Sequence, residues 1–159
     1  MLQDGAYKAC DLKDWENAEN LYKTIKDKEK SGYSALSHSS NELALAYVLK
    51  KEKKFQEAEQ VYLQALHSMD QTHERRSYKL VTFVQNLATF YQDLKRYSEA
   101  EPLFKRALHL HKQNDGSWES MLCRENYARL LRNTGRAAEA AVLEKEAKII
   151  RSRFPADEQ

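Results

Sequence analysis

Apolar side chains recur along this chain at spacings of three and four residues, which is the period of an amphipathic α-helix. Residues 86–108 carry two such stripes, separated by a short polar turn. Ala88 and Tyr91 lie in the first stripe, and Ala100 and Phe104 lie in the second. Small residues alternate with large ones, which suits two closely packed antiparallel helices. The stretch therefore predicts a helical hairpin that needs neighbours to bury its remaining apolar surface.

An alanine next to an acidic residue, with an aromatic residue four positions after the alanine, marks a repeat. It occurs at Ala18-Glu19 with Tyr22, Ala58-Glu59 with Tyr62, and Ala100-Glu101 with Phe104. A weaker copy at Glu139-Ala140 has Glu144 in the place of the aromatic residue. The four alanines are 40, 42 and 40 residues apart. A fixed period of this length is typical of a solenoid built from one repeated unit.

The stripes and the turns between them predict eight helices in four units. A single array over 1–159 is expected, with units at approximately residues 1–32, 37–70, 74–113 and 118–153. The first unit is truncated, because it opens with a short helix over 2–11. Asp14 is placed to cap the helix that follows. The last helix begins at Ala137 and ends before Pro155, and we expect its outer face to be polar, as a terminal cap requires.

Composition supports an all-α fold and argues against membrane-spanning segments. Apolar residues make up 42% of the chain and charged residues 31%, and no run approaches the roughly 18 apolar residues of a membrane span. Only four glycines and two prolines occur, so the helices should be much longer than the turns. Met1 is followed by no basic region and no apolar core, which favours a cytoplasmic location. The first unit begins mid-helix, so the chain could also be a piece of a longer protein with a targeting segment elsewhere.

The balance of charges argues against nucleic acid as a partner. Twenty-six basic and 24 acidic residues give a net charge of +2, and the two signs are interleaved. Lysine runs such as residues 50–54 are expected to be solvated helix ends. Cys10 and Cys123 have neither metal-site nor disulfide-framework spacing, so buried free thiols are expected.

No arrangement of residues predicts catalysis, a metal or a cofactor. His109 and His111 are two positions apart on a helix and point to different faces, so they do not chelate as an i, i+4 pair would. Acidic pairs that flank the repeat alanines, such as Glu99 and Glu101, are expected to be solvated helix starts rather than acid–base dyads. A glycine-rich phosphate loop is absent from the sequence. The chain is therefore predicted not to be an enzyme.

Leu87-Ala88 followed by Tyr91, and then Ala100 followed by Phe104 and Ala107, resembles the tetratricopeptide repeat (TPR). The long period, with Asn-Leu-Ala in one helix and Ala-Glu-Pro-Leu-Phe-Lys-Arg-Ala-Leu in the next, looks most like the kinesin-light-chain subclass. The stretch 125–131, leading into Gly135-Arg136, looks like the closing repeat of bacterial arrays. The resemblance implies a right-handed α-solenoid of about four hairpins that serves protein–protein interaction.

In proteins that this chain resembles, the first helix of each repeat lines a concave groove that holds an extended peptide. The groove-facing residues are then expected to be Tyr47, Gln85, Asn86, Thr89, Gln92, Asn126, Arg129 and Arg132. Asn86 and Asn126 are 40 residues apart and occupy equivalent positions. A side-chain amide both donates and accepts, so this pair could hold a peptide backbone of any sequence.

The sequence also leaves other partners open for these groove residues. Each asparagine could instead bond a neighbouring helix or water. Arg129 and Arg132 would attract an acidic side chain or a C-terminal carboxylate, but Arg129 could pair with Glu125 and Arg132 could face solvent. The lysines of a chaperone-type carboxylate clamp are replaced by Leu43 and Leu122, so that activity is not expected.

Two other functions remain open at this point. The chain could be a structural scaffold that assembles end to end into a homo-oligomer, or a regulatory segment of a larger protein. The sequence does not name the partner, because specificity in such a groove depends on a few surface residues that the fold does not dictate.

Overall fold

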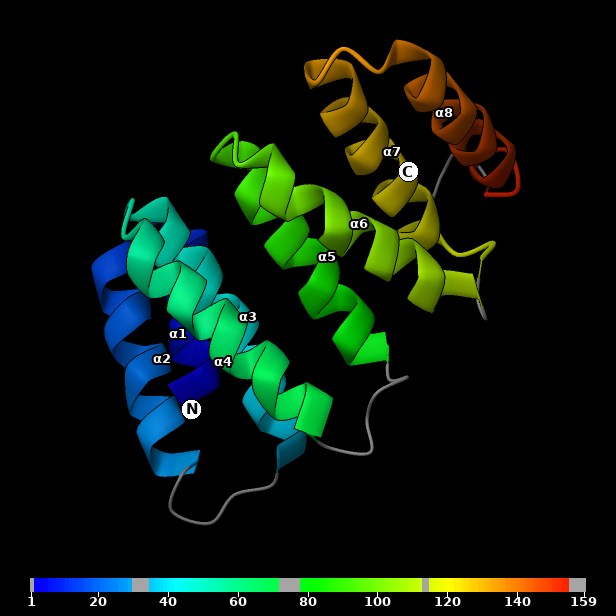
Figure 1. Ribbon diagram of the computed structural model, residues 1–159. Helices are drawn as coiled ribbons and strands as arrows, with labels where there is room; N and C mark the ends of the chain where they lie inside the picture. Colours follow the sequence, from blue (N-terminus) through cyan, green and yellow to red (C-terminus); the bar gives the residue numbers. More distant parts are fainter. Residues whose placement is uncertain (1, 30–34, 72–77, 113–114, 155–159) are drawn as a thin grey trace. The chain divides into compact units, whose positions relative to one another are not determined.

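The computed structural model of the chain describes residues 2–29, 35–71, 78–112 and 115–154, and these residues form eight helices and no strands. In chain order the helices are α1 (Leu2–Asp11), α2 (Trp15–Glu29), α3 (Ala35–Lys51), α4 (Phe55–Gln71), α5 (Tyr78–Asp93), α6 (Tyr97–His111), α7 (Trp118–Asn133) and α8 (Ala137–Arg151). Consecutive helices pair into four hairpins, as Figure 1 shows.

The chain divides into two compact units, residues 1–75 and 76–159. The first unit contains α1 to α4 and the second contains α5 to α8. Each unit therefore consists of two helical hairpins.

Most of the predicted helix boundaries agree with the structure to within two residues. The helix predicted over 2–11 has those bounds, and α2 ends at Glu29. Asp14 caps α2, because its Oδ1 accepts a hydrogen bond from the Asn17 backbone N–H at 3.4 Å. The start of the third unit was expected near residue 74, which lies outside the described residues.

The repeat alanines are fully buried in both units. Ala18, Ala58, Ala100 and Ala140 are all 0% exposed. The aromatic residues four positions later in the first three copies, such as Tyr22 and Phe104, are also buried. Small side chains let the helix axes approach, and the large ones fill the space beside them. The pattern that defined the repeat in the sequence is therefore a packing pattern.

The four hairpin turns share one backbone conformation. Lys13, Lys53, Lys95 and Gly135 have φ values of 58°, 62°, 61° and 80°. The residue after each of them donates its N–H to a carbonyl five positions back, as from Arg96 to Tyr91 at 2.9 Å. This is a Schellman motif, in which the left-handed position normally favours glycine. The chain places lysine there in three of its four turns.

The outer face of α8 differs from the polar face that we expected. Val142 is 58% exposed and Ile149 is 50% exposed. They are seven residues apart and therefore lie on the same side of the helix. Charged residues such as Lys145 and Lys148 lie near them on the exposed surface, so the face mixes apolar and charged side chains.

Candidate functional site

The predicted groove residues of the second unit lie on α5 and α7. Asn86 is exposed, and its side chain makes no hydrogen bond within the part of the chain that the structure describes. Thr89 is half-buried, and its hydroxyl donates to the Gln85 carbonyl of the same helix at 3.0 Å. Asn126 is half-buried and Arg129 is exposed. Asn86, Asn126 and Arg129 therefore leave polar groups available to a partner.

Gln92 connects the two groove-lining helices. Its side chain is only 4% exposed, and its Nε2 donates to the Asn126 backbone carbonyl at 3.0 Å. Arg129 Nη2 donates to Asn126 Oδ1 at 3.0 Å and reaches Gln92 Oε1 at 3.5 Å. The structure thus brings Gln92, Asn126 and Arg129 into one cluster, in which the glutamine is largely buried beneath the exposed arginine.

Gln85 is joined to α6 rather than free in a groove. Its Oε1 lies 3.2 Å from His111 Nε2. An amide oxygen only accepts, so the hydrogen of this contact is on His111 Nε2. His111 is 6% exposed, and its burial, with the nearby Arg124 charge, lowers the pKa of the imidazole. The sequence analysis assigned no partner to this histidine.

Neither alternative considered for Arg129 and Arg132 of α7 is found in the structure. Arg132 does not face solvent alone, because its Nε and Nη2 bind the Glu144 carboxylate of α8 at 2.5 and 2.6 Å. Glu125 binds Arg151 Nη2 at 2.6 Å and is not paired with Arg129. The alternatives were a contact within one helix for Arg129 and solvent for Arg132, whereas the observed ion pairs of Arg132 and Glu125 join the two helices of the last hairpin.

Arg129 keeps an uncompensated charge. Within the described residues its guanidinium hydrogen-bonds only to neutral amides. By contrast, four other arginines of the last hairpin each bind at least one carboxylate, namely Arg124, Arg132, Arg136 and Arg151. An exposed, oriented guanidinium without a carboxylate partner is suited to an external anion.

Tyr47 belongs to α3 of the first unit and is 46% exposed. Its ring meets the Trp15 ring edge to face, with centroids 6.1 Å apart. Lys51 Nζ lies 5.1 Å from the centre of the Tyr47 ring. Two neighbours therefore orient this ring while nearly half of the side chain remains accessible.

Two carboxylates that link successive hairpins, Glu101 and Glu19, were not predicted from the sequence. Glu101 on α6 accepts from Arg136 Nη1 through both oxygens at 2.8 Å, from Lys105, and from the Tyr127 hydroxyl at 3.1 Å. The hydrogen bonds from Arg136 and Lys105 lower the Glu101 pKa to about 2. The expectation that Glu101 is a solvated helix start is therefore wrong.

Glu19 has the same role in the first unit. It is 4% exposed and binds Lys54 Nζ at 2.6 Å, with Lys23 as a second partner. Burial raises its pKa, but hydrogen bonds from Glu52, Lys23 and Lys54 outweigh burial and bring the pKa to about 2. Both carboxylates bind a basic residue 35 positions later, at the next hairpin turn. That spacing was present in the sequence.

Other candidate chemistry in the described residues is limited. Cys10 and Cys123 are both free, but only Cys123 is buried, whereas Cys10 is partly exposed. Burial raises the pKa of the Cys123 thiol to about 12. Among the residues that the structure describes, no three His, Cys, Asp or Glu side chains gather in a way that could hold a metal ion. Nor does any helix in this part of the chain have the length and apolar character needed to cross a membrane.

Comparison with known proteins identifies the fold. The sequence profile of a tetratricopeptide repeat matches residues 85–114. BtubC from P. vanneervenii is similar in structure, with a TM-score of 0.86 at 21% identity, over 95% of this chain and 61% of that one. A kinesin-light-chain-type protein of Podosopora anserina with nearly identical TPR-like repeats has a TM-score of 0.82 at 16% identity, over 99% of this chain and 77% of that one.

PlcR of Bacillus thuringiensis, crystallised with the peptide PapR7 and DNA, has a TM-score of 0.78 at 18% identity, over 89% of this chain and 51% of PlcR. This chain thus spans less than two thirds of BtubC and about half of PlcR. The comparison with curated proteins gives no match.

These similarities define an all-α protein of repeated helical hairpins. The tetratricopeptide repeat is recognised over residues 85–114, and the fold is that of TPR solenoids with about four hairpins, as predicted. The likeness to kinesin-light-chain-type repeats is confirmed at the level of structure. Proteins with this fold are generally non-enzymatic and typically serve as protein-interaction modules and scaffolds.

Proposed function

We propose that this chain is a non-catalytic protein–protein interaction module whose α5–α7 face binds an extended peptide of a partner protein. The uncompensated charge of Arg129 is the observation that carries this function. It lies beside the half-buried Asn126 and above the buried Gln92, and all three are on the helices expected to line the groove. The complex of PlcR with the peptide PapR7 supports peptide binding by a protein of this fold.

In this proposal the groove residues have two roles. Asn86 and Asn126 contact the peptide backbone, since the Asn126 Nδ2 remains free to donate while Oδ1 holds Arg129. Arg129 binds an acidic side chain or a terminal carboxylate. Gln85, Thr89 and Gln92 mainly position their neighbours, because each already has a hydrogen-bond partner.

Arg132 lies one helical turn from Arg129 and belongs to the rim of this proposed site. Its charge is compensated by Glu144, so it adds less attraction for an acidic group. The net charge of +2 and the interleaved signs favour a protein partner over nucleic acid. The two free thiols are compatible with a cytoplasmic location, where they would stay reduced.

Peptide selection followed by mutation tests this function. Random short peptides displayed on phage would be selected on the purified chain, and a selected peptide would be titrated by fluorescence polarisation. Asn86→Ala with Asn126→Ala should weaken binding by about tenfold or more, because two hydrogen bonds of about 1 kcal/mol each are lost. The free energy of unfolding should change by no more than about 1 kcal/mol.

Asn17→Ala with Asn20→Ala is the matched control, since both asparagines are exposed on α2. Arg129→Gln should weaken binding mainly for peptides that carry a carboxylate. If the Asn86 and Asn126 double variant binds the selected peptide as tightly as the original chain, the groove proposal is wrong.

A further inference from the structure

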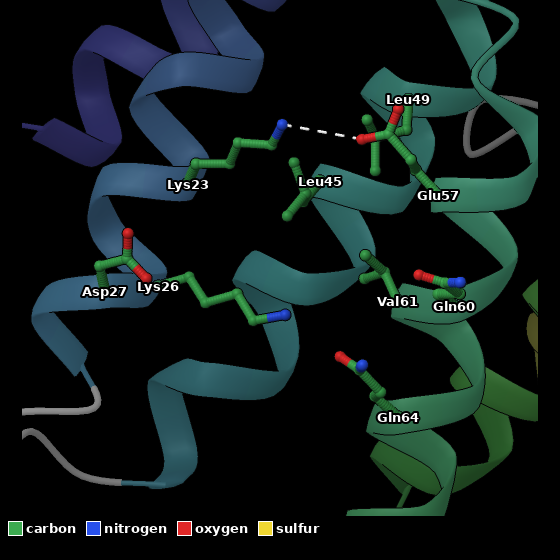
Figure 2. Close-up of a pocket in the computed structure, with 9 residues that line it drawn as sticks. All are labelled: Lys23, Lys26, Asp27, Leu45, Leu49, Glu57, Gln60, Val61 and Gln64. Carbon is green, nitrogen blue, oxygen red and sulfur yellow. Dashed lines mark ion pairs between the residues drawn. The ribbon is translucent and has the colours of Figure 1, made fainter.

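A crevice between α2 and α4 of the first unit belongs to no part of the proposed groove. It has a volume of about 330 Å³, and apolar residues of α3 and α4 form its floor. Leu45, Leu49 and Val61 line that floor and are all nearly buried. Figure 2 shows polar side chains of α2 and α4 on its two sides. The site therefore combines an apolar base with a polar margin, as ligand sites commonly do.

One position that lines the crevice differs between the repeats. Leu45 on α3 corresponds to Tyr127 on α7, 82 residues later (127 − 45 = 82), and Tyr22 corresponds to Phe104 at the same interval. The Tyr127 ring stacks on Phe104 with centroids 5.7 Å apart, and its hydroxyl reaches Glu101. Leu45 is shorter and has no hydroxyl, so the first unit leaves open space where the second places an aromatic ring.

Some polar side chains around this crevice have hydrogen-bond or ion-pair partners, and others have none among the described residues. Lys23 Nζ lies 3.8 Å from Glu57 Oε2, and this ion pair closes one end. At the other end Lys26 and Gln64 extend towards each other from α2 and α4 (Figure 2). Within the described residues, Lys26, Gln60 and Gln64 make no side-chain hydrogen bond or ion pair. Asp27, which follows Lys26 on α2, also lines the crevice and has an interaction partner of its own. The unpaired charge on the margin is therefore that of Lys26, which is complementary to a carboxylate.

The spacing of the two glutamines suits an extended chain. Gln60 and Gln64 are one helical turn apart on α4, which is about 6 Å along the helix axis. Two residues of an extended peptide span about 6.6 Å. A peptide that runs along α4 can therefore meet both side-chain amides with alternate residues. Lys23, Glu57, Gln60 and Gln64 are exposed, so the crevice covers one side of such a segment and does not enclose a free small molecule.

We propose that this crevice binds an extended acidic–apolar segment of a partner protein, with a carboxylate at Lys26 and an apolar side chain on the floor of Leu45, Leu49 and Val61. Side chains at alternate positions of an extended chain point to the same face. The recognised segment therefore carries an apolar and an acidic residue two positions apart. This site is distinct from the α5–α7 face, and either can exist without the other.

Titration of the ¹⁵N-labelled full chain with capped peptides tests the proposal. The probes contain Leu-Xaa-Glu or Glu-Xaa-Leu, and matched probes carry glutamine for glutamate. We expect saturable shifts in the NMR signals of the Gln60 and Gln64 side-chain amides and of α2 and α4. Lys26→Gln should weaken the binding of glutamate peptides about tenfold and leave glutamine peptides nearly unchanged. Lys8→Gln, at an exposed lysine on α1, should change neither.

Leu45→Tyr is the second variant, because the equivalent position already accommodates tyrosine. It should fill the crevice and reduce binding of both peptide types at least tenfold while the helical circular dichroism is retained. If that variant fails to fold, Lys26→Gln and a Gln60→Ala with Gln64→Ala variant decide the question alone.

Four results would overturn the proposal. The first is an absence of saturable shifts on α2 and α4 with every probe. The second is unchanged binding in the folded variants. The third is binding of N-acetyl-leucine as tightly as the peptides, because a free small carboxylate would then be the better ligand. Shifts confined to α5 and α7 would also overturn it, and they would support the groove instead.

Discussion

Left-handed turn residues carry local strain that the helices around them tolerate. A non-glycine residue in this conformation costs on the order of 1–2 kcal/mol relative to glycine. Lys13, Lys53 and Lys95 occupy it, whereas Gly135 does so without a side chain. The Schellman hydrogen bonds at each turn hold these residues in place, because they satisfy carbonyls at the end of the preceding helix. Sequence periodicity locates such turns but does not reveal their φ values.

Gly135→Ala should destabilise the chain by about 1 kcal/mol, because alanine disfavours positive φ. A Cβ at this position would meet no atom within 4 Å, so the loss of stability would come from backbone strain and not from a steric clash. Gly5→Ala in α1 is the control, since its Cβ would lie 3.6 Å from Leu21 Cδ1 of α2, which is an ordinary van der Waals contact. Urea denaturation should show a lower midpoint only for Gly135→Ala. Equal urea midpoints for Gly135→Ala and the original chain would contradict the prediction that a side chain at this position strains the backbone.

At the scale of helices, ion pairs between hairpins add specificity to the alanine packing. Glu101 joins α6 to the α7–α8 turn through Arg136, and Glu19 joins α2 to the α3–α4 turn through Lys54. Tyr127 reinforces the first link through its hydroxyl. Because each link begins at the residue after a repeat alanine, the same segment supplies both close packing and a directed electrostatic contact.

Glu101→Gln should lower the free energy of unfolding by about 1–3 kcal/mol at pH 7, the range for a hydrogen bond to a charged group. The folded-state pKa of Glu101 is about 2, below its ordinary value of 4.5. Its contribution is therefore present above pH 4.5 and is lost as the pH falls from 4.5 towards 2. Denaturant unfolding across this pH range should show a shallower decline for the variant.

Glu144→Gln is the matched control for that experiment. Glu144 also binds an arginine, but the pair is exposed and lies within one hairpin. Its loss should change stability much less than the loss of Glu101. If the two variants lose equal stability and show the same pH dependence, the link between hairpins has no special role.

The helices could be predicted from the sequence more fully than the contacts of their polar side chains. The three- and four-residue spacing located α1 to α8 because each helix buries an apolar stripe such as Ala100, Phe104 and Ala107. Gln92 was predicted as a groove residue from its position on α5. In the structure its side chain is buried and donates a hydrogen bond to the Asn126 carbonyl on α7, 34 residues later in the chain. Local periodicity contains no information about such a partner.

At the scale of the whole molecule, the exposed apolar surface bears on the choice between a peptide-binding module and a self-assembling scaffold. Val142 and Ile149 on α8 form a small patch among charged neighbours. A stable interface usually buries about 800 Å² on each partner, with a contiguous apolar core. Two aliphatic side chains supply only a small part of that area, so this face alone does not support a homo-oligomer.

Light scattering coupled to size exclusion should therefore give a molar mass near 18.6 kDa over a wide range of protein concentrations. Val142→Lys with Ile149→Lys should leave that mass unchanged. A mass that rises with concentration, and falls back in the double variant, would favour the scaffold function over the peptide-binding module.

The difference between Leu45 and Tyr127 also has a thermodynamic consequence. Tyrosine fills its position with atoms of the chain itself, so that contribution to stability does not depend on the surroundings. Leucine leaves a place that an external segment can occupy, and a ligand that binds only the folded state adds to stability in proportion to the logarithm of its concentration. The two units would then respond differently to the same solution: the melting of the first would depend on how much ligand is present, whereas that of the second would not.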